Sequence, residues 1–100
     1  DKDSFYYMFF FKNKKAGIVR IEKSKSKSLI GINISKEFRG KKLSSKFLRL
    51  VSNKFLSMHK NQMIFAYIKN NNFKSIKSFE SAGFIFYKSE NSILTYIKTK

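Results

Sequence analysis

Residues 30–44 combine an apolar strand, a short basic loop and the start of a helix. In such an arrangement the free N–H groups of the first helical turn and the positive end of the helix dipole face the loop. Arg39, Lys41 and Lys42 add positive side chains at the same place. We therefore expect the loop and first turn, through Ser44, to bind a phosphate-type anion mainly with backbone groups.

A second unit with the same order of strand, loop and helix follows at residues 63–84. Asn72 stands just before its helix, at the N-cap position that Asn favours. Gly83 fits the left-handed position that ends many helices. Because a helix crosses between them, the strands at residues 29–34 and 62–68 should run parallel in one sheet.

The hydrophobic pattern predicts the remaining elements. Strands at residues 5–12 and 16–23 form a hairpin with its turn at 13–15, and a polar link follows at 24–28. Helices are predicted at residues 42–60 and 73–82, and closing strands at 84–88 and 93–98. Gly31 indicates a bulge or a close backbone approach in its strand.

The resulting order is β-β-β-α-β-α-β-β. It predicts an α+β fold of the three-layer α/β type, whose mixed sheet has an antiparallel hairpin followed by two consecutive β-α units. Each helix presents one apolar stripe to the sheet. The stripes comprise Leu43, Phe47, Leu50, Val51, Phe55 and Met58 in the first helix, and Phe73, Ile76, Phe79 and Ala82 in the second.

Composition limits the functional classes. One hundred residues allow a single domain, and 42% apolar residues suffice for a packed core. The absence of cysteine excludes disulfides, thiolate metal sites and a cysteine nucleophile. The longest apolar run, residues 5–11, is far shorter than the roughly 20 residues that cross a bilayer, so no membrane partner is expected. We expect a cytoplasmic chain that binds no metal.

The formal net charge of +16 is large for this length. One interpretation is a polyanionic partner such as nucleic acid. The other is compositional drift, which we favour because the lysines are spread along the whole chain. A basic nucleic-acid-binding module therefore stays an alternative, disfavoured because the aromatic residues lie at core spacing.

The two units together resemble the hallmarks of the Gcn5-related N-acetyltransferase (GNAT) superfamily. Its first hallmark is a strand, a loop of pattern (Gln/Arg)-x-x-Gly-x-(Gly/Ala) and a helix, and the second is an Asn followed by a helix that ends in Gly-Phe. The matching residues are Arg39-Gly40-Lys41-Lys42-Leu43-Ser44 in the first hallmark, and Asn72, Ser75, Ile76, Phe79, Gly83 and Phe84 in the second. The resemblance covers nearly the whole chain. Residues 66–84 further resemble the subgroup that acts on amino-sugar nucleotides.

The resemblance implies an acyl-CoA N-acyltransferase-like fold with acetyl-CoA as co-substrate and no metal. Acetyl-CoA would lie where the strands at residues 29–34 and 62–68 splay apart. Its pantetheine arm would pair with the first strand, and its pyrophosphate would lie on the loop. The implied binding residues are Ile32, Asn33, Ile34, Arg39, Gly40, Lys41, Lys42, Leu43, Ser44, Asn72, Ser75 and Phe79.

The implied reaction is direct attack of a primary amine on the thioester. The acceptor would be an amino-sugar nucleotide in the first instance, with protein or peptide amines next. Many members carry a general-acid Tyr where this chain has Phe79, and Tyr67 is the nearest substitute in the sequence. Lys42 and Ser44 replace small residues of the loop, and lysine suits that position if its φ is ordinary.

Two further expectations follow from the resemblance. The family normally begins with another strand and two helices, so residues 1–100 are expected to form a single partial domain, completed by a homodimer partner or an additional domain. A catalytically degenerate domain that binds coenzyme A without turnover is a further alternative, because Lys42, Ser44 and Phe79 depart from the family pattern.

Overall fold

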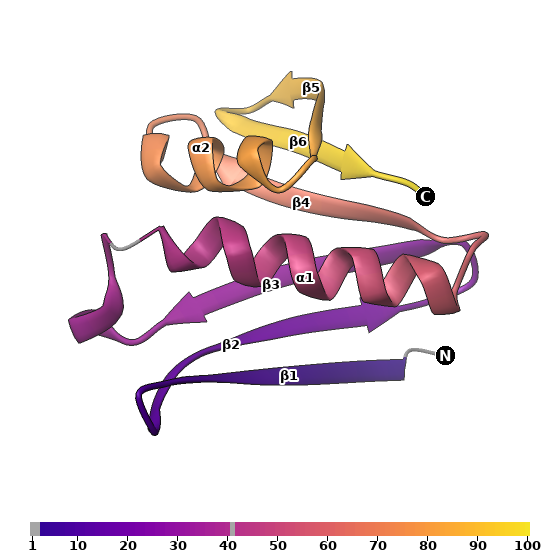
Figure 1. Ribbon diagram of the computed structural model, residues 1–100. Coiled ribbons are helices and arrows are strands. Elements are labelled where there is room, and N and C mark those ends of the chain that lie inside the picture. Colours follow the sequence, from indigo (N-terminus) through magenta and orange to yellow (C-terminus); the bar gives the residue numbers. More distant parts are fainter. Residues whose placement is uncertain (1–2, 41) are drawn as a thin grey trace.

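The computed structural model describes residues 3–40 and 42–100. It contains six strands, two α-helices and one 3-10 turn in the predicted order, and the α+β class with its mixed sheet is confirmed (Figure 1). The elements are β1 (Asp3–Phe11), β2 (Lys14–Lys23), β3 (Lys27–Ile34), η1 (Lys36–Phe38), α1 (Leu43–Met58), β4 (Met63–Lys69), α2 (Phe73–Ser81), β5 (Ile85–Glu90) and β6 (Ile93–Lys98).

One six-stranded sheet has the order β1-β2-β3-β4-β6-β5, in which only β3 and β4 are parallel. The β1–β2 and β5–β6 hairpins close with two-residue turns, at Lys12-Asn13 and Asn91-Ser92, and all four residues have φ between 51° and 66°. These left-handed pairs match the right-handed twist of the strands. The predicted turn at residues 13–15 was therefore one residue late and one residue too long.

Both helices cover the same face of the sheet. Alternate residues of β2 and β4, such as Val19, Ile21 and Ile64, point to this face and are completely buried. The opposite face carries exposed Tyr6 on β1 and Tyr67 on β4. Within the described residues the protein therefore has two layers, and the third layer of the predicted architecture is not among them.

The buried stripe of α1 is rotated slightly about the helix axis relative to the predicted stripe. Phe47, Val51 and Phe55 are buried as expected. The prediction that Leu50 and Met58 are buried was wrong, because their exposed fractions are 54% and 67%. Instead, the residue that follows each of Phe47, Val51 and Phe55 is also buried, which gives a stripe of adjacent pairs with helical spacing. The buried residues are Phe47, Leu48, Val51, Ser52, Phe55 and Leu56.

Two other predicted positions are also corrected. Phe73, at the first turn of α2, is 73% exposed because the helix only meets the core from Ile76 onward. Gly31 forms no bulge, since the β2–β3 register is continuous through Arg20↔Gly31, and a Cβ there would meet no atom within 4 Å. The close approach lies instead at Gly17, where a Cβ would come 2.8 Å from the Asn33 carbonyl oxygen.

A buried polar cluster closes the end of the sheet where β3 and β4 begin. The Gln62 side-chain amide donates to the carbonyl oxygens of Ser24 and Lys25 at 2.9 and 2.6 Å. Its oxygen accepts a 2.5 Å hydrogen bond from the Ser28 hydroxyl, and both side chains are buried. Because every polar group of Gln62 is satisfied, this cluster fixes the loop before β3 to the start of β4.

A second polar cluster joins α1, α2 and β6. The Lys98 ammonium donates to the Ser52 hydroxyl at 2.8 Å and to the Ala82 carbonyl oxygen at 2.7 Å, at the end of α2. Burial lowers the pKa of Lys98, with a smaller contribution from the nearby charge of Arg49. Arg49 itself donates to the Ser81 carbonyl oxygen. These cations satisfy carbonyls at the negative end of the α2 dipole and so hold α2 against α1.

The corrected stripe can be tested with two identical substitutions. Leu48→Ala should lower the free energy of unfolding by about 2–5 kcal/mol, because Leu48 is completely buried and the change leaves a cavity. Leu50→Ala should change it by less than about 0.5 kcal/mol, because that side chain is exposed. Urea unfolding followed by circular dichroism measures both. Equal losses for the two variants would contradict the observed stripe.

Candidate functional site

The parallel pairing of β3 with β4 ends early. Its register contains only Lys27↔Met63, Ser28↔Ile64 and Leu29↔Phe65, although β3 continues to Ile34 and β4 to Lys69. In Figure 1 the two strands start together at the right and separate toward the left. The predicted splay between them is therefore present.

In an antiparallel pair, successive residues direct their backbone N–H and C=O groups alternately toward the partner strand and away from it. The hydrogen bonds between β3 and β2, and between β4 and β6, therefore show which backbone groups face this opening. The Ser35 N–H donates to the Ala16 carbonyl oxygen, so Ile34 and Ile32 direct their own backbone groups away from β2. The Asn70 N–H donates to the Ser92 carbonyl oxygen, which by the same rule directs the backbone groups of Tyr67 away from β6. Both inner strand edges thus present backbone donors and acceptors to the opening.

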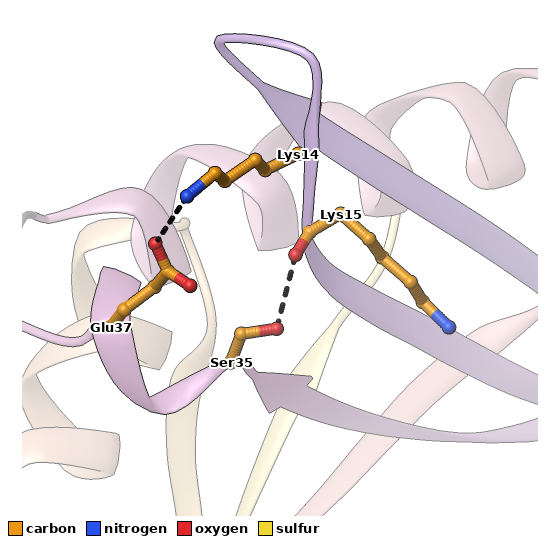
Figure 2. Close-up of polar contacts among 4 residues, drawn as sticks. All are labelled: Lys14, Lys15, Ser35 and Glu37. Carbon is orange, nitrogen blue, oxygen red and sulfur yellow. Dashed lines mark hydrogen bonds and ion pairs between the residues drawn. The ribbon is translucent and has the colours of Figure 1, made fainter.

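The segment after β3 is fixed to the beginning of β2 (Figure 2). The Ser35 hydroxyl donates to the Lys15 carbonyl oxygen at 3.1 Å, and the Lys14 ammonium lies 3.6 Å from a Glu37 carboxylate oxygen. The ion pair is exposed and contributes little by itself. Phe38 is buried against Phe11, with ring centroids 5.7 Å apart. Together these contacts position the loop that leads to α1.

Arg39 is exposed, but its side chain is held at the end of β3 by a hydrogen bond. Its Nε donates to the Ile34 carbonyl oxygen at 3.1 Å, one of the backbone groups that face the opening. A guanidinium has further donors beyond the one used here. The predicted loop residue Arg39 therefore belongs to the same opening as Ile32 and Ile34.

The loop requires left-handed backbone at two predicted positions. Gly40 has a φ of 79° and Lys42, the residue before α1, a φ of 59°. The condition under which lysine suits this position, an ordinary φ, is therefore not met. The left-handed conformation explains why the family pattern has glycine there, since a side chain costs about 1–2 kcal/mol in it. Lys41 lies outside the described residues.

The N-terminus of α1 is open to an anion. Within the described residues no side chain caps it, and its first turn carries no acidic residue. Leu43 and Ser44 form the start of this turn and are half-buried. The Ser45 hydroxyl donates to the Lys42 carbonyl oxygen at 3.2 Å and so steadies the turn without using its N–H groups. The positive end of the helix dipole therefore meets basic Lys42 and no opposing carboxylate.

The predicted residues of α2 separate into two groups. The Asn72 side-chain oxygen accepts a hydrogen bond from the Ser75 N–H at 3.2 Å, which confirms Asn72 as the N-cap. Phe79 is buried, with its ring edge to face with Phe84 at a centroid distance of 5.1 Å. Asn72 and Ser75 thus lie at the surface end of the helix, whereas Phe79 packs in the core.

Tyr67 lies on the open face of the sheet and is 50% exposed. It borders a hollow of about 410 Å³ over β4, β6 and β5, which we call the sheet hollow. The hollow is lined by Lys27, Phe65, Tyr67, Tyr87, Lys88, Glu90, Ile93 and Thr95. Sequence reasoning singled out only Tyr67 among these, because nothing in the linear order shows that β6 lies between β4 and β5.

In residues 3–40 and 42–100 no group of three His, Asp or Glu side chains could hold a metal ion. Neither described helix has the length and apolar character that a bilayer crossing needs.

The left-handed position can be tested with a pair of glycine variants. Lys42→Gly should leave the free energy of unfolding unchanged or raise it by up to about 1 kcal/mol, because relief of strain exceeds the added freedom of the unfolded chain. Lys46→Gly, inside α1, should lower it by about 1 kcal/mol. Chemical denaturation of both variants measures the difference, and equal losses would exclude strain at Lys42.

No protein-family model matches the chain, and no curated protein matches it either. The structure, however, is similar to solved acetyltransferases. The Campylobacter jejuni N-acetyltransferase PseH, in complex with acetyl coenzyme A, superimposes with a TM-score of 0.83 at 14% identity, covering 100% of this chain and 70% of that one. The ribosomal-protein-S5-alanine acetyltransferase of Vibrio fischeri gives 0.82 at 20% identity, covering 96% of this chain and 61% of that one.

A domain from Methanocaldococcus jannaschii gives a TM-score of 0.80 at 27% identity and covers 99% of this chain and 67% of that one. A further similar structure is the GNAT domain of S. lividans PAT, with a TM-score of 0.80. The chain thus spans between about three fifths and seven tenths of these proteins. Its sheet, its two helices and its splayed parallel strands together form most of the fold of the GNAT N-acetyltransferases.

Proposed function

We propose that this protein is an acetyl-CoA-dependent N-acetyltransferase that moves the acetyl group directly to a primary amine. The observation that carries the proposal is the splay of β3 and β4 next to an uncapped, basic helix N-terminus. PseH, which has the same fold, was solved in complex with acetyl coenzyme A. The fold similarity and the two hallmarks of the sequence therefore point to the same ligand.

The described residues can divide the binding of acetyl-CoA between them. The pyrophosphate would lie on the N–H groups of the first turn of α1, at Leu43 and Ser44, with Lys42 beside it. The pantetheine arm would run along β3 and pair with the backbone of Ile32, as an added strand does. Asn72 and Ser75, at the start of α2, would contact the arm from the side of β4.

The chemical step needs no covalent enzyme intermediate. The amine nitrogen attacks the thioester carbonyl carbon, the C–N bond forms and the C–S bond breaks, and the thiolate leaves with the electron pair. A general acid protonates the thiolate, and the proton lost by the nitrogen replaces the one that the acid has given up. A backbone N–H at the opening would stabilise the negative charge on the carbonyl oxygen during this step.

We propose Tyr67 as the proton donor to the thiolate. Its backbone faces the opening and its side chain lies on the open face, whereas Phe79 has no proton to give and packs in the core. For the acceptor, we propose an amino-sugar nucleotide, from the resemblance of residues 66–84 to that subgroup. We further propose a cytoplasmic location, and a second copy or a further domain that completes the fold.

A catalytically degenerate coenzyme A-binding domain is the second candidate. Phe79 favours it, because the buried ring replaces the usual general acid. This candidate predicts that acetyl-CoA stabilises the protein while no thiol is released with any amine in a broad panel.

Binding of acetyl-CoA should raise the thermal stability of the protein. At a concentration 100 times Kd the gain should be about 2.7 kcal/mol, because the ligand binds only the folded state. Ser44→Glu should abolish the shift, since its carboxylate would meet the pyrophosphate at the helix N-terminus. Differential scanning fluorimetry with up to millimolar acetyl-CoA measures both.

Ser57→Glu serves as the matched control, because Ser57 is exposed at the other end of α1. It should show the same ligand shift as the wild type. If acetyl-CoA does not stabilise the wild type, the proposal that the protein binds coenzyme A is wrong. If the shift in Ser44→Glu is undiminished, the pyrophosphate does not lie at the N-terminus of α1.

The role of Tyr67 can be tested by the rate of thiol release. Tyr67→Phe should lower the turnover rate by a factor on the order of 10²–10⁴, the range for general acid catalysis, with an unchanged acetyl-CoA shift. A thiol-reactive dye follows the reaction. Tyr6→Phe, which removes an exposed hydroxyl on β1, should keep the full rate. An unchanged rate in Tyr67→Phe would exclude Tyr67 as the acid.

A further inference from the structure

One backbone group on the inner edge of β3 is already occupied. Ile32 and Ile34 both direct their N–H and C=O groups to the opening, but the Ile34 carbonyl oxygen accepts the 3.1 Å hydrogen bond from Arg39 Nε. Because this C=O group points into the opening, a donor bonded to it lies there as well. The Arg39 guanidinium therefore lies at the outer end of the strand edge along which the pantetheine arm is proposed to run.

The backbone of Arg39 is fixed by the turn that precedes it. Its N–H donates to the Lys36 carbonyl oxygen at 3.3 Å and so closes η1. The residue before it, Phe38, is buried and packs edge to face with Phe11. The side chain of Arg39 therefore reaches back to β3 from an anchored position, and its contact with Ile34 does not depend on the loop that follows.

The contact uses a hydrogen-bond donor of Arg39 and not its charge. Among the residues that the structure describes, no carboxylate forms an ion pair with Arg39, and Glu37, two residues earlier, pairs with Lys14 instead. Glutamine carries an N–H donor at the same position of its side chain, one bond beyond Cδ, whereas methionine carries a methyl group at the corresponding position. Substitution by these two residues therefore separates the donor of Arg39 from its charge.

A ligand that pairs with a strand edge needs a single register. Groups on the same edge repeat at every second residue, so a shift to the next register moves the ligand about 6.6 Å along the strand. Such a shift would carry the thioester carbon away from the backbone N–H that is proposed to stabilise its oxygen, and a misplacement of about 1 Å can already slow a reaction about 10²-fold. The pyrophosphate holds only the far end of the arm, which has many rotatable bonds.

We propose that Arg39 is a positioning residue that sets the register of the pantetheine arm. Its guanidinium occupies the Ile34 carbonyl and so excludes the outer register, which leaves Ile32 as the outermost residue whose carbonyl is free to pair with the arm. The Ile34 oxygen has a second lone pair, but the guanidinium takes the space in which an outer amide of the arm would lie. This inference rests on the proposed acetyltransferase function and deepens it.

Fluorine NMR with two probes tests the register. The probes are the S-trifluoroethyl thioethers of coenzyme A and of pantetheine, and the second lacks the pyrophosphate. The wild type should give one bound resonance with each probe. Arg39→Gln should keep both resonances at the same shifts, because its amide donates from the same position. Arg39→Met should give a second or displaced bound resonance with the pantetheine probe, since the outer register becomes available, and a smaller change with the coenzyme A probe, whose pyrophosphate still anchors the arm.

A direct contact between Arg39 and the pyrophosphate predicts the opposite pattern. Both variants would then bind the coenzyme A probe at least about tenfold more weakly, because both lose the positive charge. The pantetheine probe would keep its single resonance and its affinity in both variants, since it has no pyrophosphate. This pattern would overturn the positioning role.

Arg20→Met is the matched control. Arg20 is exposed on β2 and its ion pair with Glu22 is long, at 3.9 Å, so the substitution removes the same charge away from the loop. It should keep a single resonance with both probes, and a second resonance in this variant would contradict the proposal. Failure of the pantetheine probe to bind a wild type that binds the coenzyme A probe would also contradict it, because the arm would then find no register on β3.

The inference and the proposed function fail in different measurements. If the coenzyme A probe does not bind the wild type and acetyl-CoA does not stabilise it, the acetyltransferase proposal is wrong, and the register of the arm is wrong with it. If the coenzyme A probe binds the wild type and Arg39→Met changes neither resonance, coenzyme binding remains supported and only the role of Arg39 is wrong.

Discussion

The early end of the β3–β4 pairing is the constraint on which the site depends. The buried Gln62 and Ser28 cluster holds the strands together at one end, where their backbones pair. Beyond Leu29 each strand follows a different antiparallel neighbour, β3 along β2 and β4 along β6. A strand forms hydrogen bonds along its two edges independently. The edges of β3 and β4 that face each other beyond Leu29 therefore have no strand paired with them, although the outer edges are fully paired. The opening therefore results from the strand pairing within the sheet.

The electrostatic half of the site is built from backbone more than from side chains. The uncapped first turn of α1 supplies N–H groups and a helix dipole, and the left-handed residues Gly40 and Lys42 turn the chain into it. Lys42 contributes a charge at a position where its conformation is unfavourable. Lysine at this position costs some stability next to the turn that we propose binds the pyrophosphate, and strained residues often cluster at functional sites.

The sequence predicted the elements well because the periods of strands and helices differ clearly, and because Asn72 and Gly83 mark the ends of α2. It predicted the splay only through the resemblance. It could not distinguish Leu48 from Leu50 as the buried residue, since both fit a broad helical stripe. The sequence also could not predict the left-handed φ of Lys42, because lysine rarely adopts that conformation. The hollow was missed because β6 inserts between β4 and β5, which sequence order does not show.

The net charge, which decides nothing about function, has a physical consequence for the exposed sheet. Edge strands β1 and β5 present exposed apolar side chains, among them Phe10 and Ile85, at 65% and 69% exposure. Such edges can pair with other copies of a chain and start aggregation. A formal charge of +16 adds a long-range repulsion between like-charged molecules that opposes such non-specific pairing. The lysines thus act as a colloidal stabiliser whose range shrinks with the Debye length as salt is added.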